Sequence, residues 1–207
     1  ISEYHTPDGV DLEVGGTVED QGDAFGDLGV LFILIVILVY IVMATQFESL
    51  LFPFIIMFTI PFAFTGVFLA LWMTSTPLSL IALIGAIMLV GIVTKNGIVM
   101  VDYMNLLVER GSGVFDAVIA GGKSRLRPVL MTSFTTILGM LPLAIGTGAG
   151  SETWQPMGIA VIGGLTCSTL LTLFIIPALY SVFVNRSQRK EKEKLARLSA
   201  EHQASVH

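Results

Sequence analysis

Charge and cysteine are scarce in this chain of 207 residues. Its single cysteine, Cys167, cannot form an internal disulfide, and its three histidines stand outside the apolar segments without the spacing of metal ligands. Only 13% of the residues are charged, whereas about 25% is usual for a soluble domain. No phosphate-binding loop, nucleophile elbow or metal-binding helix motif occurs. These absences argue against a disulfide scaffold, an ATP-driven machine and an enzyme.

Basic residues are missing from most of the chain. Residues 1–27 hold eight acids and no base, and all Lys and Arg residues except Lys95 fall within 110–127 or 186–197. Loops rich in Lys and Arg remain on the cytoplasmic side of a membrane. We therefore expect these two segments to be cytoplasmic and the N-terminal segment to lie outside. Trp72 and Trp154 then fall at the outer boundary, and Tyr103 and Tyr180 at the inner one.

Apolar residues dominate what is present. They make up 54% of the chain, and the mean hydropathy is +0.82. Four runs without Asp, Glu, Lys or Arg each reach or exceed the roughly 20 residues that span a bilayer. The longest, 49–94, is interrupted by the turn-forming cluster 74–77, so it predicts two helices. The sequence thus predicts an all-α membrane protein in the lipid bilayer, with five transmembrane helices over 28–47, 53–73, 78–102, 128–147 and 155–184.

Three segments lie outside the five helices of the predicted bundle, which covers residues 28–184. Residues 1–27 are interpreted as the end of an extramembrane domain and the lead-in to the first helix, with a short strand over 10–14. Residues 103–127 form a cytoplasmic loop that is either a plain connector or a short amphipathic helix bearing Val114, Phe115, Val118 and Ile119. Residues 185–207 are predicted to be a cytoplasmic tail, either a frayed helix or disordered.

Lys95 is the exceptional residue of the predicted spans. A lysine at the centre of a membrane helix costs roughly 2.5 to 3.5 kcal/mol on insertion scales, so it needs a partner, a wet cavity or an escape to the interface. It could snorkel toward the level of Asp102, seven residues on. The polar neighbours Thr94 and Asn96 favour an interior functional site instead. Close helix packing on the same helix is expected at three glycines, Gly85, Gly91 and Gly97.

The span 128–147 is expected to offer a companion surface. Pro128 is placed at its start, and Thr132, Thr135, Thr136 and Gly139 share one helical face. In the last span, Gly164 and Ser168 form a small-xxx-small pair, which is interpreted as helix packing. The methionines are interpreted as gap-filling side chains rather than a metal relay.

Several long strings of the sequence resemble a known family. They are FESLLFPFIIMFTIPFAFTG, GAIMLVGIVTKNGIVMVDY, RLRPVLMTSFTTILGMLPLAIGTGAG and IGGLTCSTLLTLFIIPALY. In this order they resemble the C-terminal membrane half of resistance-nodulation-division (RND) efflux permeases of the acriflavine-resistance type. The resemblance covers about residues 15–183. It implies that the five helices belong to a twelve-span transporter and that residues 1–27 are the end of its periplasmic porter domain.

The resemblance also implies a mechanism. Such permeases couple proton entry to export through two aspartates, a lysine, a threonine and an arginine within the membrane. The matching positions here are Lys95 with its neighbour Asn96, Thr132, and Arg125. The aspartates have no counterpart in this chain, so the missing N-terminal half of the permease would supply them. The chain would be a fragment of a secondary proton antiporter, driven by the proton-motive force without a cofactor.

Partners and cargo follow from the same resemblance. It implies a homotrimer in the bacterial inner membrane, joined to a periplasmic adaptor and an outer-membrane channel, and no nucleic acid. The metal-exporting branch tends to have an acid where Lys95 stands, so hydrophobic or amphiphilic compounds are the expected cargo. The alternative is a five-span structural or regulatory membrane protein, or an inert truncated permease, that transports nothing.

Overall fold

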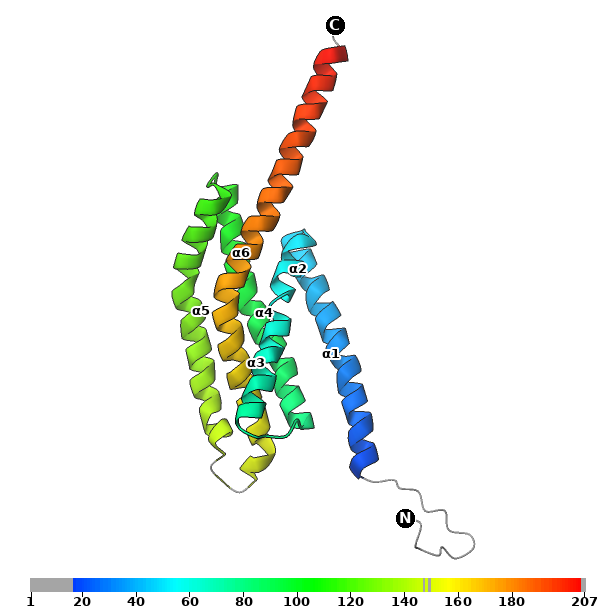
Figure 1. Ribbon diagram of the computed structural model, residues 1–207, viewed down its shortest axis with the longest axis vertical. Coiled ribbons are helices and arrows are strands. Elements are labelled where there is room, and N and C mark those ends of the chain that lie inside the picture. Colours follow the sequence, from blue (N-terminus) through cyan, green and yellow to red (C-terminus); the bar gives the residue numbers. More distant parts are fainter. Residues whose placement is uncertain (1–16, 147, 149, 206–207) are drawn as a thin grey trace, which may run out of the picture.

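The computed structural model describes residues 17–146, 148 and 150–205, with side chains described within 21–184. Helices are the only regular secondary structure in these ranges (Figure 1). They are α1 (Thr17–Phe47), α2 (Leu51–Met57), α3 (Ile60–Met73), α4 (Leu80–Glu109), α5 (Val114–Ile145) and α6 (Ser151–Ser205). The short strand predicted over 10–14 lies outside the described residues.

Five segments of the described chain are long and apolar enough to cross a membrane. They are α1, the α2–α3 pair, α4, α5 and the part of α6 up to Val184. The predicted all-α, five-span fold is therefore confirmed. The division into a periplasmic remnant, a membrane bundle and a cytoplasmic tail stays a prediction.

The second span is two helices rather than one, and a proline explains the break. Pro61 stands at the start of α3 and has no N–H to give to the carbonyl of Met57, against which its ring would also clash. The chain therefore bends at residues 58–59. The buried hydroxyl of Thr59 donates to the carbonyl oxygen of Ile56 at 2.6 Å, so this side chain is satisfied within the bend.

The turn predicted at residues 74–77 joins α3 to α4. The Thr74 and Thr76 amides donate to the carbonyls of Ala70 and Leu71, and Ser75 takes a left-handed conformation with φ of 53°. The Ser79 hydroxyl then accepts the Ala82 amide and caps α4. This connection is confirmed as the predicted reversal between two antiparallel spans.

The loop predicted over 103–127 is wrong in its extent. Only residues 110–113 connect α4 to α5, and α5 runs without interruption from Val114, with Pro128 inside it rather than at its start. Gly121 does not end a helix there. A Cβ at that position would lie 2.7 Å from the side chain of Met104, so the glycine lets α5 approach α4 closely.

The apolar residues expected on a short amphipathic helix also divide between two faces. Val114 and Val118 pack toward α4, whereas Phe115 and Ile119 are exposed. Consecutive helical residues point about 100° apart, so the two adjacent pairs cannot all share one narrow face. The segment is thus the first part of a spanning helix that packs along α4.

Three further helices extend beyond the predicted spans. Helix α1 begins at Thr17, α4 continues to Glu109, and the backbone of α6 is helical to Ser205. The uncharged runs marked only the part that lipid can cover, whereas helical hydrogen bonds continue into charged flanks. The tail predicted as either a frayed helix or disordered is helical up to Ser205.

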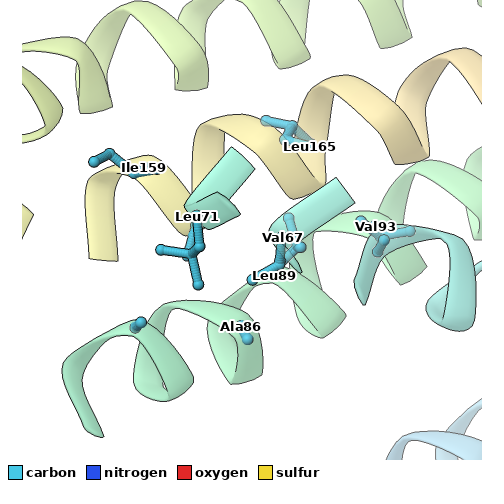
Figure 2. Packing of buried hydrophobic residues seen from close by; sticks show 10 residues of the cluster. Val67, Leu71, Ala86, Leu89, Val93, Ile159 and Leu165 are labelled. Atoms are coloured by element: carbon cyan, nitrogen blue, oxygen red, sulfur yellow. The ribbon is translucent and has the colours of Figure 1, made fainter. Parts of the chain in front are cut away.

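Helix α6 packs against α3, α4 and α5, and the core lies mainly between α3, α4 and α6. Figure 2 shows Val67 and Leu71 of α3, Ala86, Leu89 and Val93 of α4, and Ile159 and Leu165 of α6 in this core. Glycines bring the helices together. A Cβ on Gly163 would overlap the side chain of Ala70, and one on Gly164 would overlap Leu89. The predicted packing role of Gly164 is therefore confirmed.

The bundle has two ends, which we name by residues. The tryptophan end holds Trp72, Trp154, the turn 74–79 and the link 146–150, and a cleft of about 700 Å³ opens there between α3, α5 and α6. The arginine end holds Arg125, Arg127, the link 48–50 and the turn 110–113.

A second apolar cluster closes the arginine end. Met43, Met100, Met104 and Ile176 are buried in it together with Tyr180. The Tyr180 hydroxyl donates to the side-chain oxygen of Asn105 at 2.6 Å, which ties α6 to α4. Phe52 stacks on the Tyr180 ring with 5.8 Å between centroids, so the short helix α2 is attached at the same place.

Candidate functional site

Lys95 lies on an open stripe of α4. The residues seven and eleven positions to either side of it are exposed, and so is Gly91, where an added Cβ would meet nothing within 4 Å; Ile92, Ile98 and Val99 beside it are partly buried. We call the exposed residues the Lys95 stripe: Ile84, Met88, Gly91, Lys95, Asp102 and Leu106. The packed face of α4, with Ala86, Val93 and Met100, lies on the opposite side of the helix.

Two of the three glycines expected on α4 pack as predicted, but not beside Lys95. Gly85 lies against Met157, and Gly97 lies against Ile56 and Ile176. Gly97 is two residues from Lys95 and so points about 200° away from it, whereas Gly91 shares its face and is open. The interior position expected for Lys95 is therefore not formed by the described helices. The lysine makes no ion pair with a carboxylate within residues 21–184.

The polar neighbours of Lys95 are both buried. The Thr94 hydroxyl donates to the carbonyl oxygen of Val90 at 2.6 Å, so its own helix satisfies it. Asn96 is only 7% exposed. Each points about 100° away from Lys95, one to either side. Lys95 therefore lies at the centre of an open face of α4, and the polar residues on either side of that face are buried.

Arg125 of α5 contacts α4 through an aromatic ring. Its guanidinium carbon lies 4.5 Å from the ring centroid of Tyr103. The side chain is half-buried, and its Nε is fully buried without a hydrogen-bond partner among the described residues. The ring face is electron-rich and attracts the cation. This contact fixes the register between α4 and α5 at the arginine end.

This register places Thr132 at about the same depth in the bundle as Lys95. Helices α4 and α5 are antiparallel, and Thr132 follows Arg125 by seven residues as Tyr103 follows Asn96. Seven residues advance each helix by about 10 Å. Moving from the Tyr103–Arg125 contact toward the tryptophan end therefore brings Thr132 opposite Asn96. The four predicted site residues occupy two levels, with Lys95, Asn96 and Thr132 on one and Arg125 on the other.

The hydroxyls predicted on α5 do not form a buried surface. Thr132, Thr135 and Thr136 each donate to the carbonyl four residues earlier, and Gly139 has nothing within 4 Å of an added Cβ. The buried hydroxyl of α5 is Ser133, whose oxygen lies 2.9 Å from that of Thr169 in α6. Sequence reasoning missed this pair and the Tyr103–Arg125 contact. The tyrosine had been interpreted only as a boundary residue.

Within the described residues, no three His, Cys, Asp or Glu side chains are grouped as a metal site. The polar groups at the two levels are an ammonium, an amide, hydroxyls and a guanidinium. These groups can hold or orient a carboxylate supplied by another segment, and hydroxyls can pass a proton.

Residues 1–184 match the AcrB/AcrD/AcrF family. Among similar proteins, the multidrug resistance protein MdtC of Erwinia tasmaniensis is 44% identical over 156 residues, covering 74% of this chain and 15% of its own length. The cobalt-zinc-cadmium resistance protein CzcA of Cupriavidus metallidurans is 38% identical over 192 residues, covering 93% and 18%. The swarming motility protein SwrC of Bacillus subtilis is 38% identical over 191 residues, covering 92% and 18%.

The fold has a solved counterpart. A crystal structure of a heavy metal efflux pump superposes with a TM-score of 0.70 at 33% identity, covering 80% of this chain and 16% of that one. The chain thus spans less than a fifth of the length of the relatives named here. With the five apolar helices and the family match over residues 1–184, the chain belongs to the AcrB/AcrD/AcrF family of RND efflux permeases.

Proposed function

We propose that this chain is the C-terminal membrane part of a proton-driven permease that exports hydrophobic or amphiphilic compounds, and that Lys95 belongs to its proton relay. The observation that carries the proposal is the open Lys95 stripe on α4, the span whose window has the largest buried share of the five. An ammonium within a membrane is tolerated when a carboxylate or a wet cavity compensates it. A helix from the rest of the permease, docked on this stripe, would supply the carboxylates.

The relay would work by exchange of partners. An ionised carboxylate attracts Lys95, and protonation removes this attraction. The ammonium can then turn toward neutral acceptors, for which Asn96 and Thr132 lie at the same level. Two arrangements of the docked helix on α4 would result, and switching between them would link proton passage to export. Arg125, about 10 Å closer to the arginine end, would help to release the proton there.

Orientation and partners belong to the same proposal. The basic segment 110–127 and the tail 185–207 would face the cytoplasm, and the N-terminal segment the periplasm, in a bacterial inner membrane. The permease would act as a homotrimer with a periplasmic adaptor and an outer-membrane channel. The cargo assignment rests on a lysine at a position where the metal-exporting branch tends to have an acid. Relatives named for multidrug and for metal resistance both match this chain.

The test uses the intact permease in vesicles with an imposed pH gradient. Lys95→Met removes the charge at nearly constant length, and we expect export of a cationic dye to fall to the level of protein-free vesicles. The control is Met88→Leu on the same stripe, which should transport normally. Full export by Lys95→Met would refute the relay role. Divalent metal export without dye export would refute the cargo, and no export of either by the unaltered protein would favour the structural alternative.

A further inference from the structure

At the arginine end, α4 and α5 meet in a cation–π contact between Tyr103 and Arg125. The guanidinium carbon of Arg125 sits 4.5 Å from the centroid of the Tyr103 ring, and both side chains are half-buried. This distance is well within the roughly 6 Å over which a ring face attracts a cation. The ring therefore holds a flexible, charged side chain in one place.

No other described group holds the Arg125 guanidinium in place. The Nε of Arg125 is buried without a hydrogen-bond partner, and no carboxylate forms an ion pair with the guanidinium within residues 21–184. The other ionisable groups at this end are Tyr40, Glu48, Asp102, Glu109, Arg110, Asp116, Lys123, Arg127 and Tyr180. All of them are exposed except the two tyrosines, whose hydroxyls donate to Leu50 and to Asn105. The ring is thus the main described restraint on where the Arg125 charge lies.

The position of the ring connects this charge to the Lys95 stripe. Tyr103 directly follows Asp102, the charged stripe residue nearest the arginine end, and Arg125 shares a face of α5 with Thr132. The guanidinium is therefore held at the margin of the open face, about 10 Å along the bundle from the level of Lys95. A cation fixed there lowers the free energy of an ionised carboxylate on the docked helix, which favours release of its proton toward the arginine end.

We propose that Tyr103 is a positioning residue that holds Arg125 at this exit through its ring and not through its hydroxyl. The inference rests on the proposed proton relay. If the ring is lost, the arginine side chain is free to turn toward water, and the carboxylate loses the nearby charge that favours its ionised form. Proton release then requires a more alkaline cytoplasmic side.

The first experiment measures dye export by the intact permease as a function of pH on the arginine-end side of the membrane. Tyr103→Phe keeps the ring and should stay within about twofold of the unaltered protein at every pH. Tyr103→Leu should lose roughly tenfold near neutral pH and shift the half-maximal pH upward by about one unit, since a tenfold change in proton affinity is one unit. Phe52→Leu is the matched control, because Phe52 stacks on Tyr180 at the same end without touching a cation.

A purely structural role would lower export by Tyr103→Leu and Phe52→Leu alike without moving the pH profile, and this would overturn the proposal. A loss by Tyr103→Phe as large as that by Tyr103→Leu would also overturn it, because it would assign the role to the hydroxyl. A second test combines Tyr103→Leu with Arg125→Lys, which keeps the charge but not the planar fork. We expect the double variant to export no less than Arg125→Lys alone, whereas additive losses would contradict action through Arg125.

Failure of this inference can be told apart from failure of the relay. If Lys95→Met exports normally, the relay itself is wrong. If Lys95→Met is inactive while Tyr103→Leu keeps the normal pH profile, the relay stands and Tyr103 has no positioning role.

Discussion

Helices α3, α4 and α6 form a closely packed trio. Helix α5 packs along α6 and α4 but leaves most of its surface exposed, and α1 contacts mainly α2 and α4 (Figure 1); we call α1 and α5 the open helices. In the most apolar windows of the α2–α3, α4 and α6 spans, 44%, 56% and 50% of the residues are buried, against 6% for α1 and 11% for α5. Composition does not explain the difference, because the window of α1 has the highest mean hydropathy of the five. High hydropathy allows a helix to lie in a membrane, but it does not determine how closely that helix packs against its neighbours.

Small residues account for the contrast. Lipid tails are as apolar as leucine, so helices in a membrane associate through close backbone approach and polar contacts rather than through escape from water. Gly66, Gly85, Gly163 and Gly164 all lie where helices of the trio cross. On the open helices, Gly26 and Gly139 would meet nothing within 4 Å if they carried a Cβ, although α5 approaches the trio closely where Gly121 meets Met104 and where Ala144 meets Gly158. The trio is therefore a scaffold, and the open helices present surface to lipid or to the rest of the permease.

The strongest test of this contrast is Gly163→Val. The new side chain would be driven into Ala70 and the backbone of Gly66, so we expect a loss of about 3 kcal/mol in the free energy of unfolding, as for severe overpacking. Thermal unfolding of the intact permease in detergent measures it, together with the amount of folded protein in membranes.

The matched control makes the same substitution on an open helix. Gly139→Val should change stability by less than about 1 kcal/mol, since a glycine is a poor helix former and no neighbour is displaced. Equal losses for the two variants would mean that α5 is packed as tightly in the intact protein as the trio, and the contrast would disappear.

Much of this fold could be predicted because its signals are local. The length of each uncharged run, the cluster 74–77 and the placement of Lys and Arg each depend on a short stretch of sequence. The start of α5 could not be predicted in the same way. Gly121 and Gly122 look like the end of a helix until the Met104 side chain is known to lie against the first of them. A glycine has the same local appearance whether it breaks a helix or lets two helices touch.

The candidate site could likewise be predicted only where its signals are local. Lys95 could be found from the free energy of placing an ammonium in lipid, with no knowledge of its neighbours. Which face of α4 Lys95 occupies could not be predicted. Gly85 and Gly97 indicate close packing near Lys95 but not the side of the helix on which it occurs. Ser133 was likewise passed over in favour of Thr132. Adjacent helical residues point about 100° apart, and only the position of α6 decides which of them is buried.

A smaller effect is expected where α5 is attached to the trio by a polar contact. The hydroxyls of Ser133 and Thr169 lie 2.9 Å apart, and both residues are buried. Hydrogen bonds between membrane helices contribute about 0.6 kcal/mol on average and up to about 1.7 kcal/mol. Ser133→Ala and Thr169→Val should each lose an amount in this range, and the double variant should lose little more than either one.

Thr135→Val is the control for this pair, because the Thr135 hydroxyl is exposed and bonds to its own helix at Met131. Its unfolding free energy should not change measurably. Strictly additive losses for Ser133→Ala and Thr169→Val would show that the two hydroxyls do not interact in the intact protein, and α5 would then be less attached than its geometry indicates.

The smallest effect is expected on α1, at Leu34→Ala. This side chain is 61% exposed, and α1 packs mainly on α2 and α4. If lipid surrounds Leu34 before and after unfolding within the membrane, truncation removes no favourable transfer, and the change should stay within about 0.5 kcal/mol. Leu89→Ala in the trio, at 1% exposure, should lose about 2 to 5 kcal/mol through the cavity it leaves. A loss at Leu34 as large as that at Leu89 would show that another segment of the permease packs on α1, so its openness would belong to this chain alone and not to the assembled transporter.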